Sequence, residues 1–271
     1  MKKLALALVA SAAFAGQAMA ADMAVKARPA PLPPPIPVAN WTGCYISGGV
    51  GYGMSQSENY SYDATVLPRV LITDQWDTGG RGWLGRVGGG CDYQFGGIGP
   101  WQVVIGVFGD YDFADIGGRW IDPNPFFGGG LAGQTTLTDQ WAIGGRIGVL
   151  VTPQLLTYFS GGYTEAKFDG TGLSTGFAPP VVLPGFALNG QTTSGWFIGT
   201  GLEYMLNWAP GLTVKTEYRF SEFDVVRNPY FVLGTPLGLE YDSKRYVQTV
   251  TTSLSWKFNF GKSPIPVAAK Y

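Results

Sequence analysis

The stretch Leu212–Phe220, with the sequence LTVKTEYRF, decides the fold because apolar and polar residues alternate along it with a period of two. Successive side chains of a β-strand point to opposite faces, and here Lys215, Glu217 and Arg219 share one face. In the dry core of a soluble barrel each unpaired ion costs several kcal/mol. A membrane barrel turns its apolar face to lipid and has a polar interior. The stretch therefore predicts a transmembrane β-strand.

Eight segments of this kind follow one another between residues 41 and 260. They cover residues 41–54, 82–95, 101–114, 140–151, 155–168, 194–206, 212–224 and 245–260. Short gaps alternate with long gaps between these segments. The long gaps lie at about 55–81, 115–139, 169–193 and 225–244. The pattern predicts an all-β protein, an eight-stranded antiparallel transmembrane β-barrel with short periplasmic turns and four long extracellular loops. A soluble lipocalin-like barrel or β-sandwich is the competing interpretation.

Two places fit the alternation less well. Phe108 is an apolar residue on the inward parity, and in segment 155–168 two apolar sets compete, one with Leu155, Phe159 and Tyr163 and one with Leu156, Tyr158 and Phe168.

The composition excludes several classes of function. The chain has 271 residues and no His, which excludes catalytic triads, metal sites and pH switches built on imidazole. Its 18 basic and 19 acidic residues give a formal net charge of −1 and no positive surface for nucleic acid. We expect no enzymatic activity, no cofactor and no metal.

The two ends of the chain carry different signals. Residues 1–20 predict a signal peptide, with Lys2-Lys3, an apolar run and the cleavage site Ala18-Met19-Ala20. Residues 21–40 contain six prolines and predict an extended periplasmic linker. After residue 20, no apolar run approaches the roughly 20 residues of a membrane-spanning helix. Residues 261–271 are expected to form a periplasmic tail.

Strand register predicts ion pairs on the inward face. If Phe95 faces Trp101, Arg86 lies opposite Asp110; if Leu206 faces Leu212, Glu203 lies opposite Lys215. Further inward charges extend these pairs into a network, namely Glu217, Arg219, Arg146, Asp92 and Asp112.

Two functions are compatible with this network. Eight strands enclose a space that side chains nearly fill, so the charges are expected to plug the barrel. The alternative is a narrow porin-like channel for ions or small solutes, because inward glycines at 106, 144, 148, 199 and 201 leave room for water. Acid–base or metal chemistry on Asp110 and Asp112 is a weak third interpretation, since residues two apart on a strand always share a face.

Cys44 and Cys91 fall on the lipid-facing parity near the periplasmic ends of adjacent segments. Pairing them puts Tyr52 opposite Trp83 and starts the first long loop near Ser55, so a cross-strand disulfide is the favoured interpretation in the oxidising periplasm. Two free thiols acting as small hydrophobes are the alternative.

Aromatic residues predict girdles at both membrane interfaces. The periplasmic set comprises Trp41, Trp101, Trp208, Trp256 and Phe260, and the outer set comprises Trp83, Trp141 and Trp196. The long loops are where a surface ligand would bind, and they contain no recognisable pocket. Without His, haemin binding would need a Tyr, a Met or an apolar site.

Several stretches together resemble a known family. They are ADMAVKA at 21–27, NWTGCY at 40–45, GW at 195–196, GLEY at 201–204, LTVKTEY at 212–218, WKFNF at 256–260 and VAAKY at 267–271. In this order they resemble the small immunogenic outer-membrane proteins of alphaproteobacteria, an opacity-type, OmpA-like family of eight-stranded barrels. The resemblance implies the cell outer membrane as the location and a structural or surface-antigen role, with porin or haemin-binding activity in some members.

The resemblance also bears on partners and assembly. We expect contacts with outer-membrane lipid and lipopolysaccharide, with the barrel assembly machinery, and with a host or surface ligand through the long loops. Outer-membrane barrels usually end on an aromatic residue, but here eleven residues follow Phe260. The family implies that such tails are tolerated, and we predict an internal insertion signal at Trp256, Phe258 and Phe260.

Overall fold

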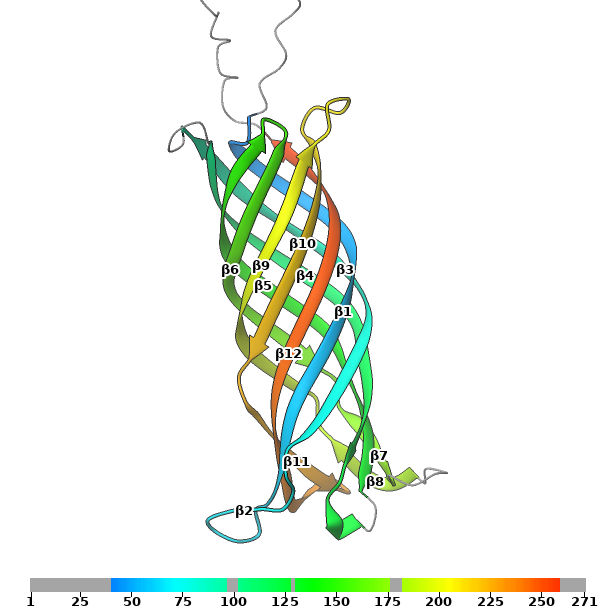
Figure 1. Cartoon of the computed structure of the whole chain (residues 1–271). Helices are drawn as coiled ribbons and strands as arrows, with labels where there is room; N and C mark the ends of the chain where they lie inside the picture. The colour runs from blue at the N-terminus through cyan, green and yellow to red at the C-terminus, as the bar shows by residue number, and fades with distance from the viewer. Residues whose placement is uncertain (1–39, 97–101, 128–129, 176–181, 259–271) are drawn as a thin grey trace, which may run out of the picture. The chain divides into compact units, whose positions relative to one another are not determined.

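The structure, a computed structural model, describes residues 40–96, 102–127, 130–175 and 182–258 (Figure 1). The predicted signal peptide, the linker up to residue 39, the tail after residue 258, Trp101 and Phe260 lie outside these residues. The strands are β1 (Gly43–Asp63), β2 (Val70–Leu71), β3 (Trp76–Phe95), β4 (Val103–Asp122), β5 (Leu131–Thr152), β6 (Leu155–Phe168), β7 (Thr171–Thr175), β8 (Val182–Leu188), β9 (Gln191–Met205), β10 (Leu212–Phe223), β11 (Val226–Val232) and β12 (Thr235–Phe258). A 3-10 helix, η1 (Pro125–Phe127), follows β4, and no described helix is long and apolar enough to cross a membrane.

The fold is a single antiparallel sheet, as the alternating sequence pattern predicts, but it has twelve strands instead of the eight predicted. Eight long strands pair in the order β1, β3, β4, β5, β6, β9, β10 and β12. β12 then pairs with β1 over twenty consecutive residue pairs, from Cys44–Phe258 to Asp63–Leu239, so the pairings of these eight strands form a closed cycle. The short strands β2, β7, β8 and β11 belong to the connections at the end away from Cys44 (Figure 1).

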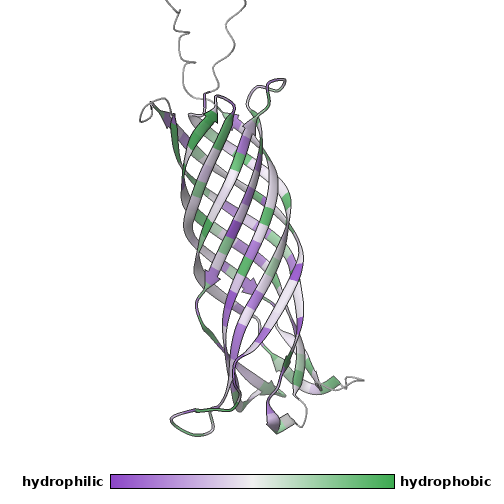
Figure 2. Ribbon diagram, viewed as in Figure 1, coloured by the Kyte–Doolittle hydropathy of each residue, from purple (hydrophilic) through white to green (hydrophobic). Residues whose placement is uncertain are grey.

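Side chains of the eight long strands alternate between a buried and an exposed face. On β10 the inward residues Lys215, Glu217 and Arg219 are buried, whereas Tyr218 is 41% exposed. Figure 2 shows apolar and polar residues interspersed along the long strands. The two doubtful places are resolved: Phe108 is buried as its parity predicts, and Leu156, Tyr158 and Phe168 form the buried set of β6. We call the side to which the buried residues point the interior.

The strands are longer than the sequence predicts. β1 continues to Asp63 instead of ending near Ser55, and β12 begins at Thr235 instead of residue 245. Most of the added residues are polar, Gly or Pro, although Leu237, Leu239 and Tyr241 are among them, and the sequence pattern assigns both stretches to loops. They remain in the ladder because the pairing of β1 with β12 extends through them without a shift. The prediction of long irregular connections is wrong for most of these residues.

Two of the three predicted registers are correct, the one that follows from pairing Cys44 with Cys91 and the one that follows from the short turn between Leu206 and Leu212. Cys44 faces Cys91, Tyr52 faces Trp83, and Lys215 faces Glu203. The third register is wrong: Phe95 faces Val103, so Arg86 lies opposite Asp112 and not Asp110. The connection from β3 to β4 is two residues longer than assumed, and a shift of two residues keeps every side chain on its predicted face.

Buried side chains fill the interior in successive groups along the strands. Nearest to Cys44 lies an apolar group with Trp41, Val104, Leu150, Leu156 and Tyr158. The charged residues follow, beside Tyr45, Phe108, Ala142 and Phe197. Next comes an apolar group that we call the middle layer, with Leu84, Ile116, Leu137, Ala166, Phe168, Phe223 and Val247. The far end has a cluster that we call the cap, with Trp76, Trp120, Leu131, Leu173, Leu188, Tyr230, Leu239 and Tyr241.

Candidate functional site in the interior

The candidate site is a set of charged side chains between the apolar groups of the interior. Alternation places them there, because each occupies an inward position of a long strand. The five cations are Arg86, Arg146, Arg219, Lys215 and Lys257, and the five anions are Asp92, Asp110, Asp112, Glu203 and Glu217. The set is therefore neutral overall. We call it the interior charge network.

One half of the network is built around two arginines. Arg86 donates to both carboxylate oxygens of Asp112, from Nε to Oδ1 at 2.6 Å and from Nη2 to Oδ2 at 2.7 Å. Arg219 binds Asp110 in the same bidentate way, at 2.8 Å from Nη1 and 2.7 Å from Nη2. Oε1 of Glu217 accepts from both arginines, at 3.2 Å from Arg86 Nη1 and 2.7 Å from Arg219 Nη2. Bidentate geometry of this kind is the strongest form of ion pair.

The other half contains Arg146 and Lys257. Nε of Arg146 lies 2.8 Å from Oδ1 of Asp92, and its Nη1 lies 2.8 Å from Oε2 of Glu203. Nζ of Lys257 lies 2.6 Å from Asp92 and 3.5 Å from Glu203, so two cations share two carboxylates. Thr213 also donates to Glu203, at 2.7 Å. Charges this deeply buried are stable only with such partners.

Two tyrosines pack against the network, and one of them, Tyr158, connects its halves. The Tyr158 hydroxyl donates to Oε2 of Glu217 at 2.8 Å, while the Tyr158 ring lies 5.1 Å from Cζ of Arg146. Tyr45 provides a second aromatic face, 4.8 Å from the Arg146 guanidinium and 4.9 Å from Nζ of Lys257. A cation over an aromatic face gains electrostatic energy. The network is thus one connected structure.

Lys215 differs from the other cations. It faces Glu203 in the ladder as predicted, but within the described residues it makes no ion pair shorter than 4.0 Å. Its ammonium lies 5.7 Å from the Tyr45 ring. Glu203 is instead bound by Arg146 and Lys257. Lys215 therefore balances the charge of the network without a bonded carboxylate.

Inward glycines do not leave open space, contrary to the expectation. A Cβ atom at Gly201 would lie 2.5 Å from the Tyr158 hydroxyl, and one at Gly148 would lie 2.7 Å from the Tyr158 Cβ. At Gly144 it would meet Phe197, at Gly199 Ser160, and at Gly106 Asp92. Side-chain and backbone atoms of neighbouring strands occupy the room that each glycine provides. This removes the sequence argument for a water path at these glycines.

The structure brings together all seven residues predicted for the network, Arg86, Asp110, Glu203, Lys215, Glu217, Arg219 and Arg146. Sequence reasoning missed Lys257, Tyr158 and Tyr45: the inward parity of Lys257 was visible, whereas that of Tyr158 was left open between two competing sets. Asp110 and Asp112 are each bound by an arginine, and no group of three metal-ligating residues occurs in the described part of the chain.

Outside the interior, the predicted disulfide is confirmed between Cys44 and Cys91. Trp83, Trp141, Trp196, Trp208 and Trp256 are exposed, as the girdle hypothesis requires. Trp41 is an exception: it is fully buried, its Nε1 donates to the Pro153 carbonyl at 3.0 Å, and its ring lies 4.9 Å from Nζ of Lys257. Trp41 covers the network and does not belong to a girdle.

Comparison with known proteins agrees with this architecture. The family described as "Outer membrane protein beta-barrel domain" matches residues 5–258. The 31 kDa outer-membrane immunogenic protein of Brucella melitensis biotype 1 is 28% identical over 270 residues, which cover 95% of this chain and 100% of that protein. Among solved structures, Neisserial surface protein A is 12% identical, with 80% of this chain and 98% of that chain covered and a TM-score of 0.35. The outer-membrane protease OmpT of Escherichia coli is 11% identical, with 80% of this chain and 97% of that chain covered and a TM-score of 0.38. Because the family match spans nearly the whole sequence, this chain belongs to the outer-membrane β-barrel protein family and is a protein of the outer membrane.

Proposed function

We propose that the eight long strands form a transmembrane barrel whose interior is closed by side chains, and that the protein serves a structural and surface-interaction role without enzymatic activity. The interior charge network, closed on both sides by apolar groups, is the observation that carries this proposal. Its arginines are used in ion pairs, so they are not free to line a conducting path.

The exposed apolar residues support a membrane-spanning zone. On β3 this zone extends from Trp83 to Phe95, which is thirteen residues or twelve steps along the strand. At about 3.4 Å per residue and a tilt near 45°, this corresponds to roughly 28 Å across the membrane. The value fits the roughly 30 Å hydrocarbon core of a bilayer. Beyond Trp83 the outward residues become polar, beginning with Arg81 and continuing with Asp77.

The far ends of the strands support a role at the cell surface. β12 has 24 residues and β1 has 21, which is far more than the ten or so that a tilted strand needs to cross a membrane. The excess carries the cap and the short strands away from the apolar zone. A surface ligand would meet this ordered extension, and membrane lipid and lipopolysaccharide would surround the apolar zone. The barrel assembly machinery is the expected partner during insertion.

Conductance measurement tests the closed interior. We expect the refolded protein to give no reproducible openings in a planar lipid bilayer. Arg146→Ala and Tyr158→Ala are expected to create openings, because each removes a large side chain between the halves of the network. Arg81→Ala, at an exposed position, is the matched control and leaves the bilayer silent. Regular openings of the unaltered protein would instead support the narrow-channel alternative.

A further inference from the structure

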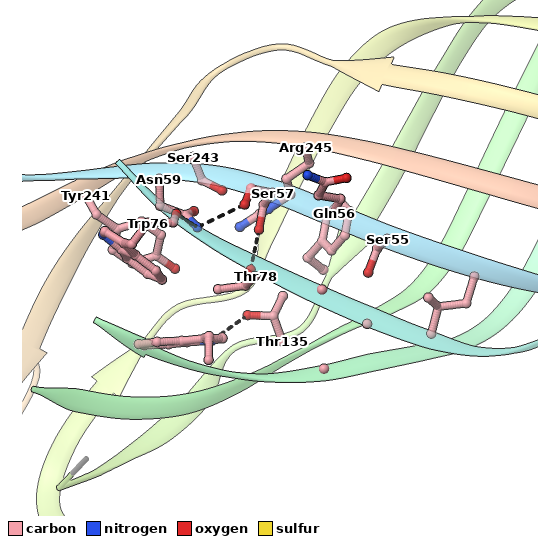
Figure 3. Close-up of a pocket in the computed structure, with 16 residues that line it drawn as sticks. Ser55, Gln56, Ser57, Asn59, Trp76, Thr78, Thr135, Tyr241, Ser243 and Arg245 are labelled. Carbon is pink, nitrogen blue, oxygen red and sulfur yellow. Dashed lines mark hydrogen bonds between the residues drawn. The ribbon is translucent and has the colours of Figure 1, made fainter. Parts of the chain in front are cut away.

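Between the middle layer and the cap lies a small cavity lined by β1, β3, β4, β5, β6 and β12 (Figure 3). Its volume is about 30 Å³. A single water needs about 10–15 Å³, so the cavity has room for two waters or for one monatomic anion. Its lining contains one charged side chain, Arg245, and no carboxylate.

Arg245 is a buried cation without a counter-charge. The residue is 5% exposed, and in the described part of the chain no carboxylate lies within 4.0 Å of it. Its guanidinium stacks on the Phe168 ring at 4.3 Å and interacts with the neutral hydroxyl of Tyr241. Nη1 is fully buried and has no hydrogen-bond partner among the described residues. A desolvated charge in this condition is strongly unfavourable unless an ion of opposite sign joins it.

The rest of the lining offers hydrogen-bond donors. The Ser243 hydroxyl is buried and has no partner among the described residues. Thr135 Oγ1 accepts a 2.9 Å hydrogen bond from Trp120 Nε1, which leaves the hydroxyl proton of Thr135 to donate elsewhere. Ser57 and Thr78 share one hydrogen bond, so one of their two protons is also available (Figure 3). Donors without a competing carboxylate are the lining that an anion needs.

We propose that this cavity binds one small monovalent anion, of the size of chloride, on Arg245 with the hydroxyl of Ser243. The anion neutralises the guanidinium and satisfies the two buried groups that protein atoms leave without partners. Larger anions such as gluconate exceed the cavity. The site lies apart from the interior charge network, so its failure would leave the proposed closed barrel unaffected.

Bromide is the probe, and the unfolding midpoint of the full chain refolded in detergent is the readout. Sodium bromide replaces sodium gluconate at constant ionic strength. We expect a saturable rise in the midpoint of roughly 2–4 °C. Arg245→Met abolishes the rise and, in gluconate alone, unfolds no earlier than the unaltered protein because it removes an unpaired buried charge. Arg81→Met, which changes an exposed arginine, retains the full bromide response.

A second variant keeps the proposal testable if Arg245→Met does not fold. Ser243→Val fills the cavity and removes one donor. It should raise the bromide concentration at half-saturation at least tenfold. Crystals soaked in bromide should show an anomalous peak within hydrogen-bond distance of Arg245 Nη1. A peak without a saturable response in solution means an adventitious ion only and overturns the proposal. An equal rise of the unfolding midpoint in Arg245→Met also overturns the proposal, and so does an equal rise when sodium gluconate is added instead of sodium bromide.

Discussion

The Tyr158 hydroxyl donates a 2.8 Å hydrogen bond to Oε2 of Glu217, and this bond joins the two halves of the interior charge network. The other oxygen of Glu217 is bound by Arg86 and Arg219. Tyr158→Phe keeps the ring and removes the donor, so a buried carboxylate oxygen loses its partner. We expect the free energy of unfolding in urea to fall by about 1–3 kcal/mol.

Tyr163→Phe is the matched control for this measurement. The Tyr163 hydroxyl is exposed and lies 3.5 Å from Glu165, so its loss should change the free energy by less than about 0.5 kcal/mol. Equal effects of the two variants would show that the bond to Glu217 contributes no more than a surface contact.

The two buried lysines are expected to differ. Lys257→Met removes a cation bonded to Asp92 and Glu203, and it should lower the free energy of unfolding by about 3–5 kcal/mol. Lys215→Met should cost less, because no bonded carboxylate loses its partner. Urea unfolding of both variants gives the comparison. If the losses are equal, overall charge balance and not bonded contact determines stability.

The disulfide is expected to stabilise the chain through its long loop. Cys44 and Cys91 are 47 residues apart, and closing such a loop is worth about 4 kcal/mol in the chain-entropy model. The double variant with Cys44→Ser and Cys91→Ser should lose a comparable amount in urea unfolding under oxidising conditions. Addition of reductant should shift the unaltered protein and leave this variant unchanged. Alkylation of two thiols without reductant would contradict the bond.

Asp122 is expected to make the cap sensitive to pH. Burial raises the pKa of its carboxyl, although Ser61 and Tyr230 donate hydrogen bonds to it at 2.9 and 2.6 Å. A raised pKa means that the folded cap binds the proton more tightly than the unfolded chain does. The stability that protonated Asp122 gives to the cap is therefore fully present below 3.8, the ordinary pKa of the unfolded chain. It is lost as the pH rises through the raised pKa of the folded state.

Hydrogen exchange tests this dependence. Exchange of backbone amides in β4 near Trp120, corrected for the intrinsic rate, should show greater protection at pH 3.5 than at pH 7. Asp122→Asn should flatten the profile. A profile that keeps its slope in Asp122→Asn would assign the effect to another group.

The insertion signal remains a prediction, since Phe260 lies outside the described residues. Trp256 and Phe258 are exposed near the Cys44 end of the strands. Deletion of residues 261–271 should preserve assembly, measured as a heat-modifiable band on a gel. Loss of assembly would mean that the tail itself carries the signal.

Outside segment 155–168, where two apolar sets competed, alternation of side chains was enough to predict which residues of the eight segments reach the interior, because strand geometry leaves only two faces. It was not enough to predict every contact. The β3–β4 register shifted by two residues, which kept Arg86, Asp110 and Asp112 inside but exchanged their partners. Lys257 was missed for a different reason: it reaches Asp92 through the β1–β12 pairing, which no turn connects. A short turn did not always determine the register: the turn between Leu206 and Leu212 gave the right pairing, whereas the β3–β4 connection gave a pairing that was wrong by two residues.

The sequence pattern also failed to predict how far the strands continue past the membrane-spanning zone. Residues such as Ser57 and Asn59 carry no apolar signal, and their strand conformation depends on pairing with β12 and β3. Arg245 begins the predicted segment 245–260, but most of the other residues that line its cavity lie outside the predicted segments, so the cavity was not predictable from parity.

Pairing of the first and last long strands has a consequence for biogenesis. Lys257 lies near the end of the last strand, and Asp92 lies on the second long strand, so the two meet only when the ring of strands closes. Until that moment Asp92 lacks one of its two cations. Closure of the ring of strands is therefore the step that brings Asp92 its second cation, in addition to Arg146.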